Sequence, residues 1–241
     1  MARQCRLDII DMLTITKSSH LGCCLSIIDI LVVLYHAVLG IEGIRQQALD
    51  RDYFILSKGH AAAALYVTLA SVDLIKHSTL EHYRENGTAL AGHPIRDTTC
   101  GIEASTGSLG HGLSIGVGLA LAARHNNAAS RVYVLAGDGE CQEGSIWEAV
   151  AMATRFNLSN LTLIVDYNKL QALDRSDDIM GELPKKFQGF GFHVIEVNGH
   201  DHTALLHAFT QRSTVTQPCV IIAHTTKGKG ICCIENKLEW H

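Results

Sequence analysis

The residues in this sequence best suited to bind a metal ion are a glycine-flanked aspartate and an asparagine. Gly137-Asp138-Gly139 follows an apolar run, and Asn168 follows the next apolar run, about 30 residues after Asp138. Mg²⁺ is usually held by one or two protein oxygens together with the phosphate oxygens of a bound ligand. Asp138 and Asn168 supply such oxygens, and the two glycines would let the backbone approach a diphosphate. Either Asp-Gly or Asn alone more often marks a turn, but together they favour a site for a metal ion and a diphosphate.

A helix predicted after this aspartate could add to anion binding. Ser145 and Glu148 have the spacing of a capping box, which would begin the helix close to the glycine-flanked aspartate. The field at a helix N-terminus contributes only about 0.3–2 kcal/mol to the binding of an anion. A metal ion would therefore have to supply most of the binding energy for a diphosphate.

The common nucleotide-binding signatures do not fit. A dinucleotide fingerprint needs a third glycine three residues after a Gly-x-Gly pair. In four such pairs that position is occupied by another residue, namely Gln142, Leu121, Val194 or Cys233. Neither Lys58 nor Lys229 lies in the frame of a Walker loop. The hypothesis that the protein binds a nicotinamide cofactor therefore loses its main support.

The elements that must position these residues form a predicted parallel sheet. Four β-rich apolar runs, at 131–136, 161–166, 192–197 and 219–223, alternate with helical segments near 145–156, 179–189 and 201–212. This alternation indicates a doubly wound α/β fold of three layers, with a mostly parallel sheet between two layers of helices. Polar residues follow the runs at 137–140, 167–169, 198–201 and 224–227. Because parallel strands end at one edge, we expect these segments to lie around a ligand site at a switch point in strand order.

The N-terminal part of the sequence predicts helices around one further strand. Apolar residues recur at helical spacing over 3–17 and 27–38, and Ser26 with Asp29 has the spacing of a capping box for the second helix. Residues 53–56 have the pattern of a short strand, and 61–70 and 109–124 have the pattern of helices. Residues 86–108 lack sustained periodicity and are predicted to be a loop.

The composition predicts one globular domain spanning residues 1–241. Hydrophobic residues make up 47% of the 241 residues, charged residues make up 18%, and the formal net charge is −4. These values argue against a disordered chain and against a nucleic-acid-binding surface. The longest apolar stretches, 30–35 and 113–123, are too short to span a membrane, so we expect no membrane partner. The eight cysteines include no C-x-x-C pair, which favours reduced thiols in a cytoplasmic protein.

Eight collinear segments give the sequence a specific resemblance to a known family. GDG followed about 30 residues later by Asn resembles the thiamine diphosphate motif, and the whole set resembles the N-terminal half of transketolases. The segments are KSSHLGCCLS (17–26), DRDYFILSKGHAAAALY (50–66), AGHP (91–94), STGSLGHGLSIGVGLALA (105–122), GDGECQEGSIWEA (137–149), DYNKLQ (166–171), FGFHVIEVNGHD (190–201) and HTTKGKGI (224–231). They span essentially the whole chain in family order, so the resemblance implies the thiamine diphosphate-binding fold of that half.

The resemblance implies both a metal site and a cofactor site. It places Asp138, Asn168 and the backbone carbonyl of Leu170 as ligands of Mg²⁺, or of another divalent cation such as Ca²⁺ or Mn²⁺. The residues that it places in contact with thiamine diphosphate are His60, Gly107, Ser108, Leu109, Asp138, Gly139, Glu143, Asn168, Lys227 and His241.

The resemblance also implies which residues take part in catalysis. These are the histidines His20, His60, His93 and His241, together with Glu143, a carboxylate at a subunit interface that couples two cofactor sites in the family. Thiamine diphosphate supplies the carbon–carbon bond chemistry, so the protein has to move protons and shield charge. Neutral imidazole suits this near pH 7 and typically contributes about 10²–10⁴-fold as acid or base. The histidines that we expect on the surface are His36, His77, His82, His125, His193, His202 and His207.

The activity that the resemblance implies is ketol transfer. A transketolase moves a two-carbon ketol unit from a ketose or ketose phosphate to an aldose or aldose phosphate. Whole transketolases continue into a second domain, which binds the aminopyrimidine ring and supplies an activating glutamate, and this sequence ends before such a domain. We therefore expect a separate pyrimidine-domain subunit to complete the active site, in a homodimer or a heterotetramer.

Two other interpretations stay open. One is a related thiamine-dependent activity that resembles 1-deoxyxylulose-5-phosphate synthase, and the other is a scaffold subunit that keeps the fold without catalysis. Two positions depart from the family pattern: His111 stands where Gln is common, and Leu21 stands where Pro usually follows the first histidine. These departures affect the expected substrate geometry and leave the metal site unchanged.

Overall fold

A five-stranded parallel sheet forms the centre of the fold. In the computed structural model, which describes residues 1–172 and 174–240, the strands are β1 (Tyr53–Leu56), β2 (Val132–Gly137), β3 (Leu161–Tyr167), β4 (His193–Asn198) and β5 (Cys219–His224). Their order is β1-β2-β3-β5-β4, and every neighbouring pair is parallel. The five predicted strands are confirmed to within one residue at either end.

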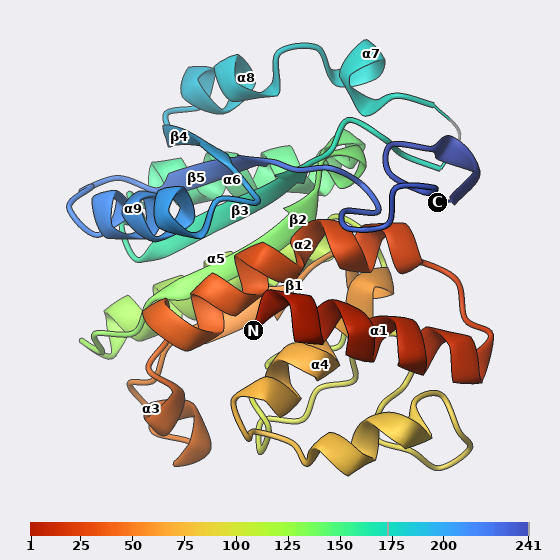
Figure 1. The fold of residues 1–241 in the computed structure, drawn as a ribbon. Coiled ribbons are helices and arrows are strands. Elements are labelled where there is room, and N and C mark those ends of the chain that lie inside the picture. The colour runs from red at the N-terminus through yellow and green to blue at the C-terminus, as the bar shows by residue number, and fades with distance from the viewer. Residues whose placement is uncertain (173, 241) are drawn as a thin grey trace.

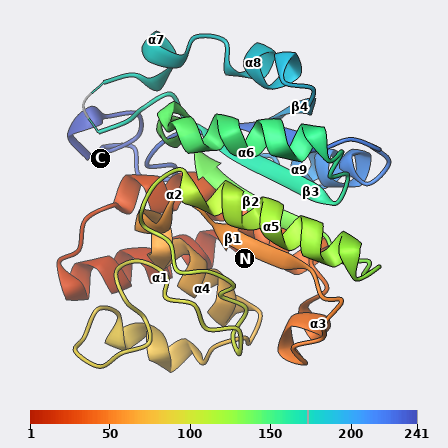
Figure 2. The same ribbon diagram turned by 180° about the vertical axis from the view of Figure 1, so that it is seen from behind.

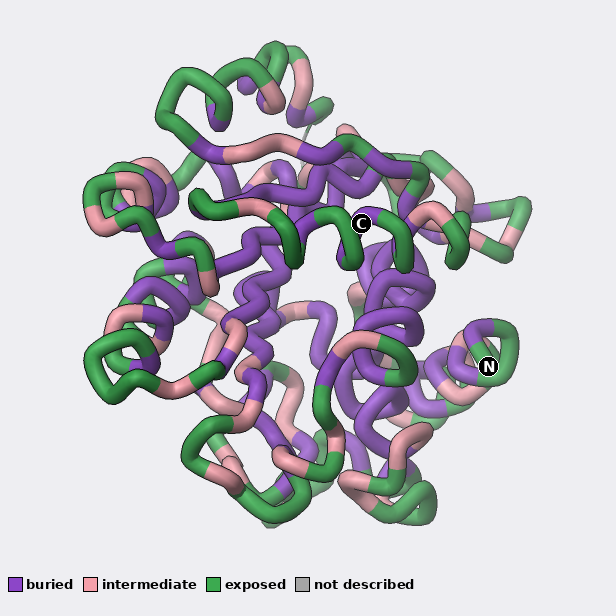
Figure 3. The backbone as a smooth tube through the Cα atoms, turned by 90° about the vertical axis from the view of Figure 1, so that its left-hand side faces the viewer, coloured by how far each residue is buried: buried purple, intermediate pink, exposed green. Residues whose placement is uncertain are grey.

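Burial on both faces explains why the central strands are almost continuously apolar. All seven residues of β3 are buried, and so are the first five residues of β2 and of β5. The edge strand β4 instead alternates between buried and exposed residues toward its end. The buried backbone accordingly runs through the middle of the molecule in Figure 3, with exposed segments around it.

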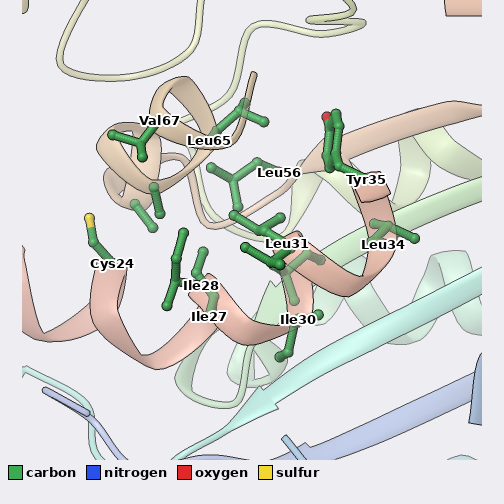
Figure 4. Packing of buried hydrophobic residues seen from close by; sticks show 14 of the residues in the cluster. Cys24, Ile27, Ile28, Ile30, Leu31, Leu34, Tyr35, Leu56, Leu65 and Val67 are labelled. Carbon is green, nitrogen blue, oxygen red and sulfur yellow. The ribbon is translucent and has the colours of Figure 1, made fainter. Parts of the chain in front are cut away.

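One face of the sheet is covered by α1 (Ala2–Thr16), α2 (Leu21–Val33), α4 (Ala62–Ser71) and α9 (His202–Arg212). Figure 1 shows α2 in front of the sheet and α1 beside α2 and α4. Their buried side chains form one hydrophobic cluster with sheet residues such as Tyr133 and Ile164. In Figure 4, Leu31 of α2 lies beside Leu56 of β1 and Leu65 of α4.

The opposite face is covered by α5 (His111–His125), α6 (Gly144–Arg155) and α8 (Leu183–Gly189), with the short α7 (Ser176–Met180) before α8. Figure 2 shows α5 and α6 in front of the sheet from this side. Leu113, Val150 and Phe187 from these helices join Val134 and Leu163 of the sheet in a second hydrophobic cluster. The predicted three-layer, doubly wound α/β fold is therefore confirmed.

The remaining elements are short. They are a π-helical turn at Leu34–Val38 that continues α2, the helix α3 (Ile41–Arg45), and 3₁₀ turns at Gly59–Ala61, His77–His82, Gly139–Gln142 and Leu238–Trp240. No helix or strand is assigned between residues 83 and 110, which agrees with the predicted loop over 86–108.

Within residues 1–172 and 174–240, one helical segment is long and apolar enough to cross a membrane. Leu21–Val38 has 18 residues and a mean hydropathy of 2.2. It consists of helix α2 and the π-helical turn that continues it, and together they are longer than any uninterrupted apolar stretch in this segment. In the fold 78% of this segment is buried. Such burial is typical of the core helix of a globular domain, and Figure 4 shows the segment in that role.

Both predicted capping boxes are wrong. Helix α2 begins at Leu21, so Ser26 and Asp29 lie inside it, and the Ser26 hydroxyl donates to Asp166 of β3 instead of a helix terminus. Ser145 lies in the first turn of α6, but its hydroxyl donates to the Gly110 carbonyl. In each case the serine side chain that local spacing would assign to a helix cap makes a hydrogen bond to a distant residue instead.

The predicted helix over 179–189 is divided into α7 and α8. Gly181 ends α7 with a φ of 57°, a conformation that glycine adopts readily. Pro184 then stands in the first turn of α8, where its missing N–H costs no helical hydrogen bond.

The chain leaves neighbouring strands on opposite faces of the sheet. After β1 it passes to α4 on one face, and after β2 it passes to α6 on the other. In a doubly wound sheet such a divergence opens a crevice at the carboxyl ends of the strands, where ligands bind.

Candidate functional site

A pocket of about 320 Å³ lies at this divergence. Its walls come from the segments after β1, β2 and β3, from the loop after β5, from the start of α2 and from the loop before α5. The lining residues are His20, Cys23, Lys58, His60, His93, Gly107, Leu109, Gly137, Asp138, Gly139, Glu140, Asn168, Leu170, Gln171, Ala172 and Lys227. A pocket of about 540 Å³ lies elsewhere, between α1 and the turn His77–His82, but no strand end reaches it.

Asp138 is a buried carboxylate, 3% exposed, directly after β2. Its Oδ1 accepts a hydrogen bond from the Gly139 N–H (2.8 Å), and its Oδ2 accepts from the Lys169 N–H (2.5 Å) and the Ser176 hydroxyl (2.7 Å). Burial, with the nearby charge of Asp166, raises the pKa of Asp138 to about 6 in spite of these hydrogen bonds. A cation beside Asp138 would favour its charged form.

Asn168 and Leu170 lie beside Asp138 at the end of β3. The Asn168 amide group donates from Nδ2 to Asp166 Oδ2 (3.1 Å), which fixes its orientation, and its Oδ1 accepts from the Leu170 N–H (3.0 Å). One carboxylate, one amide oxygen and one backbone carbonyl make the all-oxygen set that a hard divalent cation prefers. Among residues 1–172 and 174–240 no group of three His, Cys, Asp or Glu could hold a metal. The residues present therefore fit a cation that also takes ligand oxygens from a bound phosphate.

Lys227 brings a cation to the same corner of the pocket. Its side chain is 2% exposed, and its Nζ lies 3.4 Å from the Leu170 carbonyl oxygen. Burial, and after it the neighbouring charge of Lys58, lowers the pKa of Lys227 to about 8. The ammonium group remains the major form at pH 7 and can attract an anion in the pocket.

The histidines His20, His60 and His93 form another part of the pocket wall. The rings of His20 and His60 are 5.3 Å apart, and His20 Nδ1 is buried without a hydrogen-bond partner among the described residues. Such an orphaned polar atom at a pocket suits contact with a polar ligand. Burial, and then the charges of His60 and His20, lowers the pKa of His93, which favours neutral imidazole near pH 7.

Gly107 explains how His93 approaches the pocket. Its φ is +145°, and a Cβ at this position would lie 3.0 Å from Cδ2 of the His93 ring. A Cβ at Gly59 would likewise lie 2.8 Å from the Gly107 nitrogen. The two glycines therefore let the 106–107 loop pack between His60 and His93.

Glu140 is a buried carboxylate that the sequence did not reveal as a site residue. Its Oε1 accepts from the Gly110 N–H (2.8 Å) and from the Ser57 hydroxyl, and its Oε2 accepts from the Gly137 N–H (3.1 Å). Glu140 thus joins the ends of β1 and β2 to the start of α5. The signal in the sequence was its place three residues after Gly137, at a strand end.

A buried ion pair between Lys58 and Asp166 was also missed. Lys58 Nζ lies 2.5 Å from Asp166 Oδ2, and Asp166 additionally accepts from Ser26, Asn168 and the Thr225 hydroxyl. Burial alone would disfavour the ammonium group, but the attraction of Asp166 raises the pKa of Lys58 above its usual value. Lys58 follows β1 closely. Inspection of the polar residues after this strand, as for the four later strands, would have identified it.

Some predicted site residues lie outside the pocket. Ser108 and Glu143 are exposed on this chain and do not line the pocket, and His111 is exposed with its Nδ1 3.1 Å from the Leu109 carbonyl oxygen. Of the four predicted polar strand ends, the segment 198–201 after β4 does not line it either. His241 lies outside the described residues.

The histidines predicted on the surface are exposed with one exception. His36, His77, His82, His125, His202 and His207 are exposed. His193, the first residue of β4, is half-buried, and its Nε2 is buried without a partner among the described residues. The predicted surface position of His193 is therefore wrong, because its Nε2 is shielded from solvent.

Together, the doubly wound parallel sheet and the glycine-lined polar pocket at its switch point define an α/β domain that binds a ligand at the carboxyl ends of its strands. The family model for the transketolase, thiamine diphosphate binding domain matches residues 1–241. This chain therefore belongs to the transketolase family, in the part of it that binds thiamine diphosphate.

Individual relatives agree with this assignment. The chain is 42% identical over 224 residues to one subunit of the apulose-4-phosphate transketolase of Actinobacillus succinogenes, a match that covers 92% of this chain and 81% of the relative. It is 37% identical to the protein of the same name from Phocaeicola vulgatus, over 98% of this chain and 85% of the relative. It superposes on a crystal structure of transketolase from Campylobacter jejuni with a TM-score of 0.91 and 32% identity, over 100% of this chain but only 39% of that chain.

Proposed function

We propose that this chain is the diphosphate-binding subunit of a two-subunit transketolase that requires thiamine diphosphate and a divalent cation, Mg²⁺ above all. It would transfer a two-carbon ketol unit from a small ketose or ketose phosphate to an aldose or aldose phosphate. The observation that carries the proposal is the convergence of Asp138, Asn168, Leu170 and Lys227 on one corner of a pocket at the switch point of the sheet.

The roles of the chain's own residues follow from this geometry. Asp138, Asn168 and the Leu170 carbonyl would hold the cation, while Lys227 and the amides of the glycine turns would face the diphosphate. Thiamine diphosphate, when bound, supplies the chemistry that breaks and forms the carbon–carbon bond. The opening beside His20, His60 and His93 is then the place for the sugars.

The histidine wall would serve proton transfer at the sugar hydroxyls. His20 Nδ1 has no partner among the described residues and is available to a sugar hydroxyl, and the lowered pKa of His93 favours a neutral imidazole that can accept a proton. We propose the same role for His60 in the pocket and for His241, and we propose cofactor contact for Gly107, Ser108 and Leu109.

The proposal also includes a second chain, which would complete the active site. Two relatives of similar length are each named as one subunit of a transketolase, which supports a partner that binds the pyrimidine end of the cofactor. Glu143 is exposed on this chain, and we propose that it contacts another chain in the assembly, a homodimer or a heterotetramer. We place the protein in the cytoplasm, because all eight cysteines are free thiols.

Calorimetry of thiamine diphosphate binding is the first test. The parent chain, mixed with a pyrimidine-domain transketolase subunit, should bind thiamine diphosphate in the presence of Mg²⁺ and lose binding when EDTA removes the metal. Asp138→Ala should lose the Mg²⁺-dependent part, whereas Asp178→Ala, an exposed carboxylate outside the pocket, should bind like the parent. Absence of binding in the parent mixture would support the scaffold interpretation and refute the proposal.

The activity is tested with the same mixture of the two chains. Ketol transfer between a ketose phosphate and an aldose phosphate should require both chains, thiamine diphosphate and Mg²⁺. Full activity from the isolated chain would refute the need for a second chain. Consumption of pyruvate with release of carbon dioxide would instead favour the activity that resembles 1-deoxyxylulose-5-phosphate synthase.

A further inference from the structure

A buried carboxylate outside the pocket joins several elements of the fold. Asp29, within α2, accepts hydrogen bonds from Arg6 (2.5 Å from Nη2), His200 (2.8 Å from Nδ1) and His202 (2.8 Å from Nε2). These partners belong to α1, to the turn after β4 and to the start of α9. Burial opposes ionisation of Asp29, but the three partners more than offset it and lower its pKa well below the usual value. Asp29 is therefore a stable anion.

The second ring nitrogen of His200 reaches the loop after β5. The backbone N–H of Thr226 donates to His200 Nε2 over 2.7 Å. Because a backbone N–H can only donate, Nε2 must be unprotonated, and Nδ1 carries the proton that His200 donates to Asp29. The two contacts thus define a neutral imidazole with its proton on Nδ1.

The same loop, residues 225–230, makes further contacts with its surroundings, among them the hydrogen bond from the Thr225 hydroxyl to Asp166. Arg6 donates from Nε to the Lys229 carbonyl (3.1 Å), and the Gly228 N–H donates to the Gly22 carbonyl near the start of α2 (3.0 Å). Lys227 lies between these anchor points, and its side chain lines the pocket. The position of the Lys227 ammonium therefore depends on how firmly the loop is held.

We propose that His200 is a positioning residue that holds the 225–230 loop, and with it Lys227, at the cofactor pocket. The inference rests on the proposed function, because Lys227 is the residue through which the loop would act on a diphosphate. His200 itself does not line the pocket. It connects the Asp29 anion on α2 to a loop amide, and only one tautomer of its ring can make both contacts.

Protonation of His200 should release the loop. An imidazolium ring carries N–H groups on both nitrogens, so Nε2 could no longer accept from Thr226, and two donors would face each other. The contact of Nδ1 with Asp29 would persist in either state. The charged and titratable groups that face His200 are Asp29 on α2, Arg3 and Arg6 on α1, His202 on α9, and Lys229 and Glu235 after β5.

The tautomer can be observed directly in the full chain. At pH 7.5, nitrogen-15 NMR of the histidine rings should show His200 with a protonated Nδ1 and an unprotonated Nε2. A His200 ring that carries its proton on Nε2, or on both nitrogens, at this pH would overturn the proposal. This measurement needs neither cofactor nor partner, so it is independent of the proposed function.

Two variants separate the positioning role from a merely structural one. His200→Gln offers an amide oxygen to Thr226 and an amide N–H to Asp29, but it cannot titrate, whereas His200→Leu loses both contacts. His207→Gln, an exposed position of α9, is the matched control. The quantity measured is the amide hydrogen-exchange rate of residues 225–230 at pH 7.5.

The expected pattern has three parts. His200→Leu should exchange faster than the parent at pH 7.5 by about fivefold or more, the order expected for one lost hydrogen bond. The parent and His207→Gln should exchange slowly at this pH, and His200→Gln should exchange within about twofold of the parent. Equal exchange in all chains, or failure of His200→Gln to restore slow exchange, would overturn the proposal.

Thiamine diphosphate affinity at pH 7.5 with Mg²⁺ completes the test. His200→Leu should bind about tenfold more weakly than the parent, and His200→Gln should bind within about twofold. If His200→Leu loosens the loop without changing the affinity, the positioning role is overturned and the proposed function stands. If the parent chain with its partner does not bind thiamine diphosphate at all, the proposed function fails, and the exchange rates still decide whether His200 holds the loop.

Discussion

Removal of the Lys58 ammonium group should strongly destabilise the fold, because it leaves a buried carboxylate uncompensated. Lys58 is 2% exposed and Asp166 is 0% exposed. Burial opposes ionisation of Asp166, but the charge of Lys58 and the surrounding hydrogen bonds keep its pKa below the usual value. Deleting one partner of a buried ion pair typically costs about 3–5 kcal/mol. Because each kcal/mol shifts the Tm of a chain this size by about 2–4 °C, Lys58→Met should lower the Tm by about 6–20 °C.

The pH dependence of this loss has a definite sign. In the parent chain the lowered pKa of Asp166 stabilises the fold at every pH above about 4. Without Lys58, the folded-state pKa of Asp166 should rise above its unfolded value, so that protonation relieves the buried charge as the pH falls. The destabilisation by Lys58→Met, measured by differential scanning calorimetry, should therefore be larger at pH 8 than at pH 5.

A double-mutant cycle isolates the interaction between the two side chains. The variant Lys58→Met/Asp166→Asn should be more stable than the sum of its single changes predicts. Lys185→Met is the control: its ion pair with Glu182 has side chains 72% and 69% exposed, so the change should cost less than about 1 kcal/mol. Stability of Lys58→Met within about 1 kcal/mol of the parent at pH 8, with no coupling in the cycle, would refute the reasoning.

Three further results are expected. Gly116→Ala places a Cβ 2.5 Å from a side-chain carbon of β2 and should cost about 1–3 kcal/mol, whereas Gly118→Ala in the same helix has open space and should gain up to about 1 kcal/mol; urea unfolding of the two variants tests this contrast. Asp29→Asn should cost about 2–4 kcal/mol at pH 7, and the loss should shrink progressively as the pH falls below about 4, because the stabilisation from the lowered pKa of Asp29 is lost between its unfolded and folded pKa values; unfolding at pH 7 and pH 3 measures it. Ellman titration of the native chain should show two fast thiols, Cys232 and Cys233, with the six buried thiols reacting only after unfolding, and a third fast thiol would contradict the burial.

The sheet could be predicted from the sequence because its strands are buried on both faces. Apolar runs such as 161–166 can form little else when helical segments alternate with them, and each strand was placed to within one residue. The start of α2 could not be predicted in the same way. This helix is buried almost all round, so it has no amphipathic stripe to mark its ends, and Ser26 could be mistaken for a cap because its contact with Asp166 is 140 positions away in the sequence.

The candidate site likewise contains features that could be predicted from the sequence and features that could not. Asp138 and Asn168 could be found because each follows a predicted strand, and the structure places both in one pocket. Lys58, Glu140 and His200 also follow predicted strands, but their partners could not be predicted, because tertiary contacts between distant segments set them, such as Lys58 with Asp166 across 108 positions. A charged residue in an apolar setting shows that it needs a partner, but only the fold shows which partner it has.

Buried charge explains how a pocket lined by glycine loops can hold a defined shape. Glycines such as Gly107 and Gly139 allow close approach to a ligand, but they have no side chains to pack, so the hydrophobic clusters cannot fix these loops. Asp166 joins Lys58 after β1, Ser26 in α2 and Thr225 after β5, while Asp29 joins α1 and α2 to the next stretch of that loop through Arg6 and His200. Apolar side chains at the positions of Asp166, Asp29 and their partners would lower the free-energy cost of removing charge from water. They would, however, leave the loop amides without the directed partners that preorganise a site for an anion.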